Sequence, residues 1–330
     1  MIRLRWPLLA LALALCIGAG PRSIAPLEPA IDSDFPDPAI LRTRDGSFFV
    51  YATQGEQDGK MQNIQAARST DLREWTRIGD VLPVKPTWAS RTQDFWAPHV
   101  SEHDGRFYLY YSAKPDAALS DGRQGLCLAV ATALRPEGPF TDTGRPLVCG
   151  EGFVNIDPMA FDDPKTGKRL LYWGSGFKPI KVQELAVDRM SFMPGSVAHD
   201  LIAPVPDDRP DNYRRLVEGA WVTRHGGWYY LFYSGDNCCG AKAHYATLVA
   251  RSRGAIGPFE TLPGLVHAAK GNWLAPGHNA VVMDKRGQYW SLYHAVDTRN
   301  PRSTPEADIN SRRVMLIEPL VWKNGIPKVR

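Results

Sequence analysis

Residues 44–51 read Arg-Asp-Gly-Ser-Phe-Phe-Val-Tyr, and this sequence of a charged turn, a glycine and a run of aromatic and β-branched residues decides the fold. The pattern returns as His-Asp-Gly-Arg-Phe-Tyr-Leu-Tyr-Tyr at 103–111 and three more times along the chain. Glycine suits a tight hairpin turn where φ is positive, and the aromatic runs have the composition of strands. The glycines of the five copies are 59, 62, 60 and 60 residues apart: Gly46, Gly105, Gly167, Gly227 and Gly287.

Each repeat contains further strand signals. A second strand-like segment follows the first, as at 64–69 and 126–132, and some repeats add a Gly-Pro-Phe turn, as at 138–140. About four short strands in each repeat is the pattern of propeller blades around a central axis. A pair of β-sandwiches is the alternative, but the regular spacing does not suit it. We predict an all-β, five-bladed β-propeller in which the segment before each aromatic run is the innermost strand.

The first 25 residues have the pattern of a signal peptide. Arg3 and Arg5 give a positive start, residues 8–17 are a continuous apolar run, and small residues follow at 18–20. The run is short for a membrane helix, which needs about 20 apolar residues. We predict a signal peptide over 1–25, a single catalytic domain over 26–330 without a membrane span, and a secreted or periplasmic location. An uncleaved membrane anchor is one alternative. Lipid attachment at Cys16 is a weaker one, because the preceding Leu15 is bulky where a lipoprotein signal has a small residue.

The charge of the mature chain limits its partners. Removal of residues 1–25 takes away Arg3, Arg5 and Arg22 and no acid, so the net charge falls from +4 to +1. A nearly neutral chain has no charge that would attract nucleic acid or an anionic membrane. We therefore expect no nucleic-acid partner, and a monomer.

Four cysteines remain in the mature chain. An even number in an exported protein favours disulfides, and no Cys-x-x-Cys pair suggests a zinc site. The simplest arrangement pairs Cys127 with Cys149, and Cys238 and Cys239 then either pair with each other or stay as free thiols.

Three acids precede aromatic runs in apolar surroundings. Asp37 lies in Phe-Pro-Asp-Pro-Ala-Ile, Asp157 in Val-Asn-Ile-Asp-Pro-Met and Glu218 in Leu-Val-Glu-Gly-Ala-Trp-Val. An Asp-Pro pair alone usually marks a surface turn, but three acids at the innermost place of three blades would meet at one mouth of the channel. Burying a carboxylate is costly unless it is paired or functional. Glycoside hydrolysis uses a carboxylate base and a protonated acid, and a third carboxylate nearby raises the pKa of the acid.

The sequence resembles glycoside hydrolase family 43, the five-bladed arabinanases, arabinofuranosidases and xylosidases. The resemblance covers roughly residues 30–330. It implies that Asp37 is the general base, Asp157 the pKa modulator and Glu218 the general acid, with inversion at the anomeric carbon. The motifs that carry it are Asp37-Pro38, Phe95-Trp96-Ala97-Pro98, Asn155-Ile156-Asp157-Pro158, Val217-Glu218-Gly219 and Pro276-Gly277-His278-Asn279.

Two further segments, Cys238-Cys239-Gly240 and Leu320-Val321-Trp322, are similar to the arabinan-active branch. In that branch the histidine of Gly-His-Asn lies on the central axis, often near calcium or another ion, which here implies His278. A lone histidine in a strand is more often a satisfied core residue. Calcium prefers several oxygen ligands and His278 offers one nitrogen, so we expect no required cofactor, and a structural calcium near His278 only if waters complete its shell.

Sugar-binding side chains are expected beside the acids. The aromatic candidates are Phe95, Trp96 and Trp221, although packing between blades explains Trp221 and also Trp173 equally well. The polar candidates are Asn155, Ser175 and one of Arg312 and Arg313, which open the last long strand. Strand alternation alone does not choose between the two arginines.

We therefore expect a secreted inverting hydrolase that cleaves α-1,5-linked L-arabinofuranosyl residues of arabinan or arabino-oligosaccharides from the plant cell wall. An exo-acting α-L-arabinofuranosidase or β-xylosidase with the same acids is an alternative. A non-catalytic carbohydrate-binding propeller is a second alternative, against which the three acids argue. Endo or exo action depends on whether loops close one end of the cleft.

Overall fold

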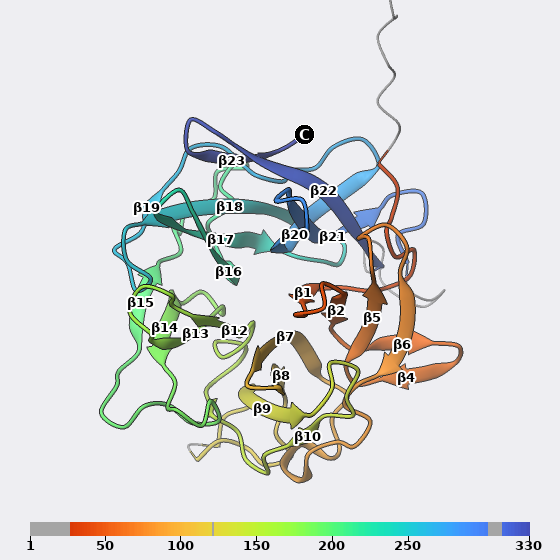
Figure 1. Ribbon diagram of the computed structural model, residues 1–330, viewed down its shortest axis with the longest axis vertical. Helices are drawn as coiled ribbons and strands as arrows, with labels where there is room; N and C mark the ends of the chain where they lie inside the picture. Colours follow the sequence, from red (N-terminus) through yellow and green to blue (C-terminus); the bar gives the residue numbers. More distant parts are fainter. Residues whose placement is uncertain (1–26, 121, 303–311) are drawn as a thin grey trace, which may run out of the picture.

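The computed structural model describes residues 27–120, 122–302 and 312–330. The predicted signal peptide lies outside these residues. Five antiparallel sheets surround a central axis, and the chain passes through them in order (Figure 1). The prediction of an all-β, five-bladed β-propeller is confirmed.

The blades are built from these strands, given from the inside outward. Blade 1 contains β1 (Ala39–Arg42), β2 (Phe48–Ala52), β5 (Gln65–Ser69) and β6 (Thr76–Asp80), with a side hairpin of β3 (Gly55–Gln57) and β4 (Lys60–Gln62). Blade 2 contains β7 (Phe95–His103), β8 (Arg106–Ala113), β9 (Cys127–Ala133) and β10 (Thr141–Asp142), with β11 (Val148–Cys149) also paired to β9. Blade 3 contains β12 (Met159–Asp162), β13 (Arg169–Trp173), β14 (Ile180–Glu184) and β15 (His199–Ile202). Blade 4 contains β16 (Val217–His225), β17 (Trp228–Asn237), β18 (His244–Ser252) and β19 (Glu260–Thr261). Blade 5 contains β20 (Trp273–Met283), β21 (Tyr289–Asp297), β22 (Arg313–Lys323) and β23 (Ile326–Val329).

The innermost strands β1, β7, β12, β16 and β20 gather around the axis (Figure 1). The aromatic runs form the second strand of each blade, and all five residues of β2 are buried. Both faces of a blade pack against neighbours, so these strands are apolar on both faces and show no alternation. The only helix among the described residues is a short 3₁₀ turn at Thr87–Ala89.

In each of the first four blades, a tyrosine of the second strand fastens the blade to the next one. Its ring is buried and its hydroxyl donates a hydrogen bond to a backbone carbonyl of the following blade, which satisfies the polar tip of the side chain. The donor–acceptor pairs are Tyr51 to Pro136 at 2.7 Å, Tyr110 to Arg189 at 2.8 Å, Tyr172 to Ala255 at 2.6 Å and Tyr230 to Gly325 at 2.9 Å.

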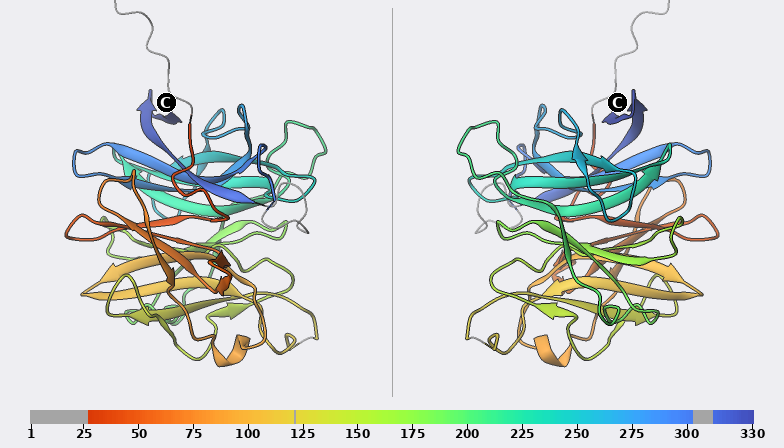
Figure 2. Two further views of the ribbon diagram at one scale, coloured as in Figure 1. Left: turned by 90° about the vertical axis from the view of Figure 1, so that its right-hand side faces the viewer. Right: turned by 90° about the vertical axis from the view of Figure 1, so that its left-hand side faces the viewer.

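The two ends of the chain close the ring. The segment before β1 runs beside β22, as the red and dark blue ribbons show (Figure 2). Phe35 N donates to Arg313 O at 2.8 Å, and Arg313 N donates to Asp34 Oδ1 at 2.9 Å. The first and last blades are therefore joined at the point where the chain enters β1. No helix in the described part of the chain is long and apolar enough to cross a membrane.

Candidate active site

Every blade has a residue with left-handed backbone just before or within its innermost strand. These residues are Asp37 (φ 58°), Ala97 (φ 46°), Asp157 (φ 61°), Gly219 (φ 61°) and His278 (φ 49°). Few non-glycine residues adopt this conformation, and its recurrence marks a functional mouth of the propeller. Asp37 and Asp157 occupy equivalent places, but Glu218 precedes the equivalent residue, Gly219. The expectation of three equivalent acids is therefore wrong by one position for Glu218.

In four of these residues, the backbone N–H donates to a side chain that lies in or just after the second strand of a blade. Ala97 N donates to Thr53 Oγ1 at 2.8 Å, and His278 N donates to Ser234 Oγ at 2.7 Å. Asp157 N likewise donates to Ser112 Oγ at 3.2 Å, and Asp37 N to His294 Nδ1 at 3.1 Å. Because each acceptor belongs to the preceding blade, the ring of blades itself sets the orientation of the carboxylates.

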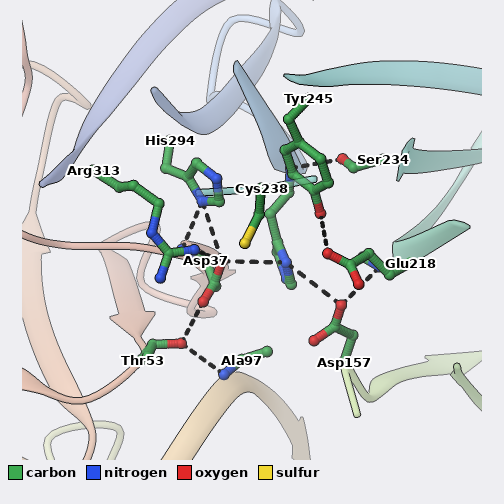
Figure 3. Close-up of polar contacts among 12 residues, drawn as sticks. Asp37, Thr53, Ala97, Asp157, Glu218, Ser234, Cys238, Tyr245, His294 and Arg313 are labelled. Carbon is green, nitrogen blue, oxygen red and sulfur yellow. Dashed lines mark hydrogen bonds and ion pairs between the residues drawn. The ribbon is translucent and has the colours of Figure 1, made fainter. Parts of the chain in front are cut away.

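The three acids line one cavity of about 630 Å³ at this mouth. This volume lies in the usual range of small-molecule sites, roughly 300–1,000 Å³. Figure 3 shows the carboxylates of Asp37, Asp157 and Glu218 pointing toward one another from three blades. The three carboxylates therefore face one shared cavity.

Asp37 is held as an anion. Burial alone would raise its pKa, but the charge of Arg313 is the largest of the effects that hold the pKa well below its usual value. Arg313 Nη1 lies 3.1 Å from Asp37 Oδ1, and Thr53 Oγ1 donates to Asp37 Oδ2 at 2.5 Å. A carboxylate that stays ionised beside a cavity has the properties of a general base.

Glu218 and Asp157 have the opposite tendency. Burial raises the pKa of Glu218, and hydrogen bonds from Ser175 and Tyr245 partly oppose this effect. Burial also raises the pKa of Asp157 well above its usual value, and the negative charge of Glu218 adds to this. Asp157 Oδ2 accepts a hydrogen bond from Gly219 N at 2.9 Å. The cavity thus contains one acid held ionised and two that favour the protonated form, which is the division of roles that acid–base catalysis requires.

His278 lies between two of the acids. Its Nδ1 is 3.5 Å from Asp37 Oδ1 and 3.8 Å from Asp157 Oδ2. Burial lowers the pKa of its imidazole, which favours the neutral form. The described residues contain no group of three or more His, Cys, Asp or Glu side chains arranged to hold a metal. Since calcium takes about six to eight oxygen ligands, the side chains around His278 do not form a calcium cage by themselves, and the ion stays a prediction.

The chain matches the family model of glycosyl hydrolases family 43 over residues 26–327. It belongs to this family. The match confirms the resemblance seen in the motifs, and it makes this protein a glycoside hydrolase of a family of inverting enzymes.

Similar proteins support the assignment to family 43. A β-D-galactofuranosidase, XynD, from Aspergillus niger is 29% identical over 81% of this chain and 75% of its own length. The extracellular endo-α-(1→5)-L-arabinanase 1 of Bacillus subtilis is 26% identical over 95% of this chain and 94% of its own. The crystal structure of a thermostable family-43 glycoside hydrolase superposes with a TM-score of 0.71 at 26% identity, covering 90% of this chain and 93% of that one.

Four of the predicted polar and aromatic residues reach the site of this family 43 enzyme. Trp96, His278 and Arg313 line the cavity. Ser175 donates to Glu218 Oε2 at 2.5 Å.

The other predicted substrate-binding residues do not reach it. Phe95 is fully buried against Tyr111, because successive side chains of a strand point to opposite faces and Trp96 takes the cavity side. Trp221 packs against His99, and Asn155 accepts a hydrogen bond from Trp173 Nε1 at 3.0 Å. Arg312 pairs with Asp32, away from the acids. The expectation that Phe95, Trp221, Asn155 and Arg312 contact substrate is therefore corrected.

Sequence reasoning missed several residues of the site. Tyr245 donates to Glu218 Oε1 at 2.7 Å and is buried, while His294 contacts both the backbone and the carboxylate of Asp37. Tyr245 lies in β18 and His294 in the aromatic run of β21, and nothing in either local sequence separates them from core residues. Phe153 and Phe177 also line the cavity, and they belong to loops outside the repeat.

Two disulfides are present. Cys127 and Cys149 join β9 to β11, just before the loop that leads to Asp157. Cys238 and Cys239 are bonded to each other and line the cavity after β17. The Cys127–Cys149 bond therefore fastens the segment that leads into blade 3 to β9 of blade 2.

Proposed function

We propose that this enzyme hydrolyses α-1,5-linked L-arabinofuranosyl bonds of arabinan or arabino-oligosaccharides with inversion of configuration. The observation that carries the proposal is the cavity in which Asp37 is held ionised while Glu218 favours its protonated form. The B. subtilis relative that spans nearly the same length is described as an endo-arabinanase. A plant cell-wall polysaccharide is the corresponding natural substrate, and the enzyme acts on it as a monomer.

The proposed reaction is a single displacement. Asp37 takes a proton from a water molecule as the water oxygen bonds to the anomeric carbon. The bond from that carbon to the leaving oxygen breaks at the same time, and the proton of Glu218 passes to the leaving oxygen. Asp157 orients Gly219, the residue after Glu218, through its hydrogen bond. The negative charge of Asp37 adds to burial in favouring the protonated form of Glu218.

The hydrogen-bond donors around Asp37 and Glu218 support the roles proposed for these two acids. Arg313 and Thr53 both contact the Asp37 carboxylate, so its ionised form is stabilised before water binds. Both oxygens of Glu218 instead face neutral hydroxyls, those of Ser175 and Tyr245. A neutral hydroxyl can also accept a hydrogen bond, so either oxygen can carry the proton.

A panel of substrates tests the proposal. Debranched arabinan, arabino-oligosaccharides, xylo-oligosaccharides and galactofuranosyl glycosides would be compared by kcat/KM, and NMR of the first product would report the anomer. We expect arabinan and its oligosaccharides to be hydrolysed best, with β-arabinose released first. Preference for xylo-oligosaccharides or galactofuranosides would contradict the arabinan assignment while leaving the machinery in place.

An exo-acting arabinofuranosidase or a β-xylosidase is the second candidate, because the same three acids serve both modes. Product length on debranched arabinan separates the modes. Release of single arabinose units from the start indicates exo action, and a mixture of oligosaccharides indicates endo action.

We also propose that the protein works outside the cytoplasm. The similar arabinanase of B. subtilis is described as extracellular, and disulfides form and persist in oxidising compartments.

A further inference from the structure

Two phenylalanines stand exposed at the rim of the catalytic cavity. Phe153 is 37% exposed and Phe177 is 63% exposed. Their rings meet edge to face with centroids 6.2 Å apart, and both rings line the cavity that holds the three acids. Singly scattered apolar side chains on a surface need no explanation, but two paired rings at the edge of a polar site do.

The backbone at Phe177 has an unusual conformation. Its φ is 61°, in the left-handed region that bulky residues avoid, and the neighbouring Gly174 and Gly176 also have positive φ. A cost of this kind is retained where the surrounding structure and the function require it. The turn from 174 to 177 therefore holds an aromatic ring at the cavity. A glycine or a polar residue at position 177 would adopt the left-handed backbone more easily.

The same turn carries a contact to the proposed general acid. Ser175, two residues before Phe177, donates to Glu218 Oε2 at 2.5 Å. The general acid protonates the leaving oxygen, so groups fixed beside it lie on the leaving-group side of the scissile bond. Phe177 lines the cavity from the same turn that contacts this acid.

The segment that carries Phe153 is held firmly against this turn. A Cβ atom at Gly176 would lie 2.7 Å from Val154 Cγ1 and 3.0 Å from Val154 N, so only glycine allows this approach. Gly152 N donates to Gln124 O at 2.9 Å, and the Cys127–Cys149 bond fixes the strand just before it. The two rings therefore form a preorganised surface, which reduces the entropy cost of binding.

We propose that Phe153 and Phe177 form a platform for the sugar residues on the leaving-group side of the bond that is cleaved. The C–H face of a sugar ring would pack on the two aromatic rings, while its hydroxyls stay in contact with water. This inference rests on the proposed glycosidase function and extends it, because it assigns a specificity-determining surface to a chain of at least two sugars.

The test compares substrates with and without a leaving sugar. Phe153→Ala, Phe177→Ala and the double variant would be assayed on arabino-oligosaccharides of increasing length and on α-L-arabinofuranosyl fluoride. Leu134→Ala is the matched control, because Leu134 is 75% exposed and is not part of the cavity lining. Phe177→Tyr retains the ring, and thermal unfolding of each variant verifies that it is folded.

We expect kcat/KM on oligosaccharides to fall roughly 3- to 10-fold for each lost ring, mostly through KM, from the usual size of aromatic packing effects. The alanine variants should hydrolyse the fluoride with kcat/KM within twofold of the wild-type value. Phe177→Tyr should retain oligosaccharide cleavage, because it keeps the ring. Equal losses on both substrates, or losses no larger than those of Leu134→Ala, would overturn the platform.

These outcomes are separate from the fate of the proposed function. A wild-type enzyme that cleaves only xylo- or galactofuranosyl oligosaccharides overturns the arabinan assignment, and the same length comparison on that class then decides the platform. A wild-type enzyme that cleaves none of the three classes overturns both.

Discussion

Ser175 donates a 2.5 Å hydrogen bond to Glu218 Oε2, whereas the matching hydroxyls of blades 2 and 4, Ser112 and Ser234, accept a backbone N–H from the next blade. The repeat is broken at the blade 3–4 junction, where the backbone N–H of Gly219 is taken by Asp157. Asp157 thus replaces the serine as acceptor, and the serine is free to hold the acid. The break in the repeat is what assembles the acid and its modulator.

Substitution of Asp37 and of Glu218 should separate the roles of the general base and the general acid. Glu218→Gln should slow arabinan on the order of 10²–10⁴-fold, which is the usual contribution of positioned proton transfer, but slow activated aryl glycosides much less. Asp37→Asn should slow both substrates by similar factors, because water must be activated whatever group leaves. Steady-state kinetics on both substrates measures this. Identical leaving-group dependence in the two variants would show that the roles are wrongly assigned.

Azide provides an independent check on the base. A small anion can replace the attacking water when the base carboxylate is missing, so azide should restore activity to Asp37→Asn and give a glycosyl azide of inverted configuration. Glu218→Gln serves as the comparison under the same conditions.

The alkaline limb of the pH–rate profile should respond to substitution of the residues around Glu218. The acid is active when protonated, so activity falls as pH rises through its raised pKa. Tyr245→Phe removes a hydrogen bond that favours the carboxylate, so the pKa rises further and the limb moves to higher pH. Asp157→Asn replaces a carboxyl that itself favours the protonated form, so the limb should move less than in Tyr245→Phe. Profiles of kcat/KM measure both variants, and a limb that moves to lower pH in Tyr245→Phe would refute the assignment.

Removal of Arg313 should act on the opposite limb. The arginine holds the pKa of Asp37 low against the effect of burial, so Arg313→Met should raise that pKa and move the acidic limb of the profile to higher pH. It should also destabilise the fold by about 3–5 kcal/mol, because a buried carboxylate loses its charged partner. Arg313→Lys keeps the charge, so its acidic limb and its stability should lie between those of the wild type and those of Arg313→Met. Urea unfolding and pH profiles provide the readouts, and an unmoved acidic limb would count against the base assignment.

The two disulfides should differ in their effect on stability. Cys127 and Cys149 are 22 residues apart, so the Cys127→Ala/Cys149→Ala variant should lose about 3 kcal/mol of unfolding free energy in the chain-entropy description. Cys238 and Cys239 are adjacent, so their bond constrains almost no chain, and replacing both with alanine should cost much less. Urea unfolding of the two double variants makes the comparison. A larger loss for the adjacent pair would contradict it.

Cleavage of the N-terminal segment is also testable. We expect the chain exported by its native host to begin between about residues 19 and 26, since signal peptides are removed after small residues of the kind found at 18–20. Intact-mass measurement of the secreted protein decides this. Retention of Met1 would contradict it.

The fold could be predicted because the sequence of the second strand recurs in every blade. Aromatic runs after each glycine turn report directly on strands that are buried on both faces, and the Asp-Pro pairs locate the mouth of the channel. Glu218 could be assigned to the site in spite of its offset, because it directly precedes Gly219 and its longer side chain reaches the same cavity.

The rest of the site depends on contacts that no local pattern encodes. Phe95 and Trp96 differ only in which face of β7 they occupy, and Arg312 and Arg313 differ in the same way at the start of β22. Tyr245 resembles the other buried tyrosines in composition, and only its position opposite Glu218 gives it a role. Phe177 was missed because its left-handed turn lies between two strands, where periodicity carries no information.

The junction of blades 1 and 5 also sets the order in which the enzyme becomes competent. Asp37 is among the first residues of the mature domain to be synthesised, but its partner Arg313 follows 276 positions later. Asp34, which precedes Asp37, accepts from the backbone of that same late residue. A nascent or truncated chain that stops before β22 therefore has its base without the cation that keeps it ionised. We therefore expect hydrolytic activity only after the last blade has docked, so that activity reports on completion of the whole ring.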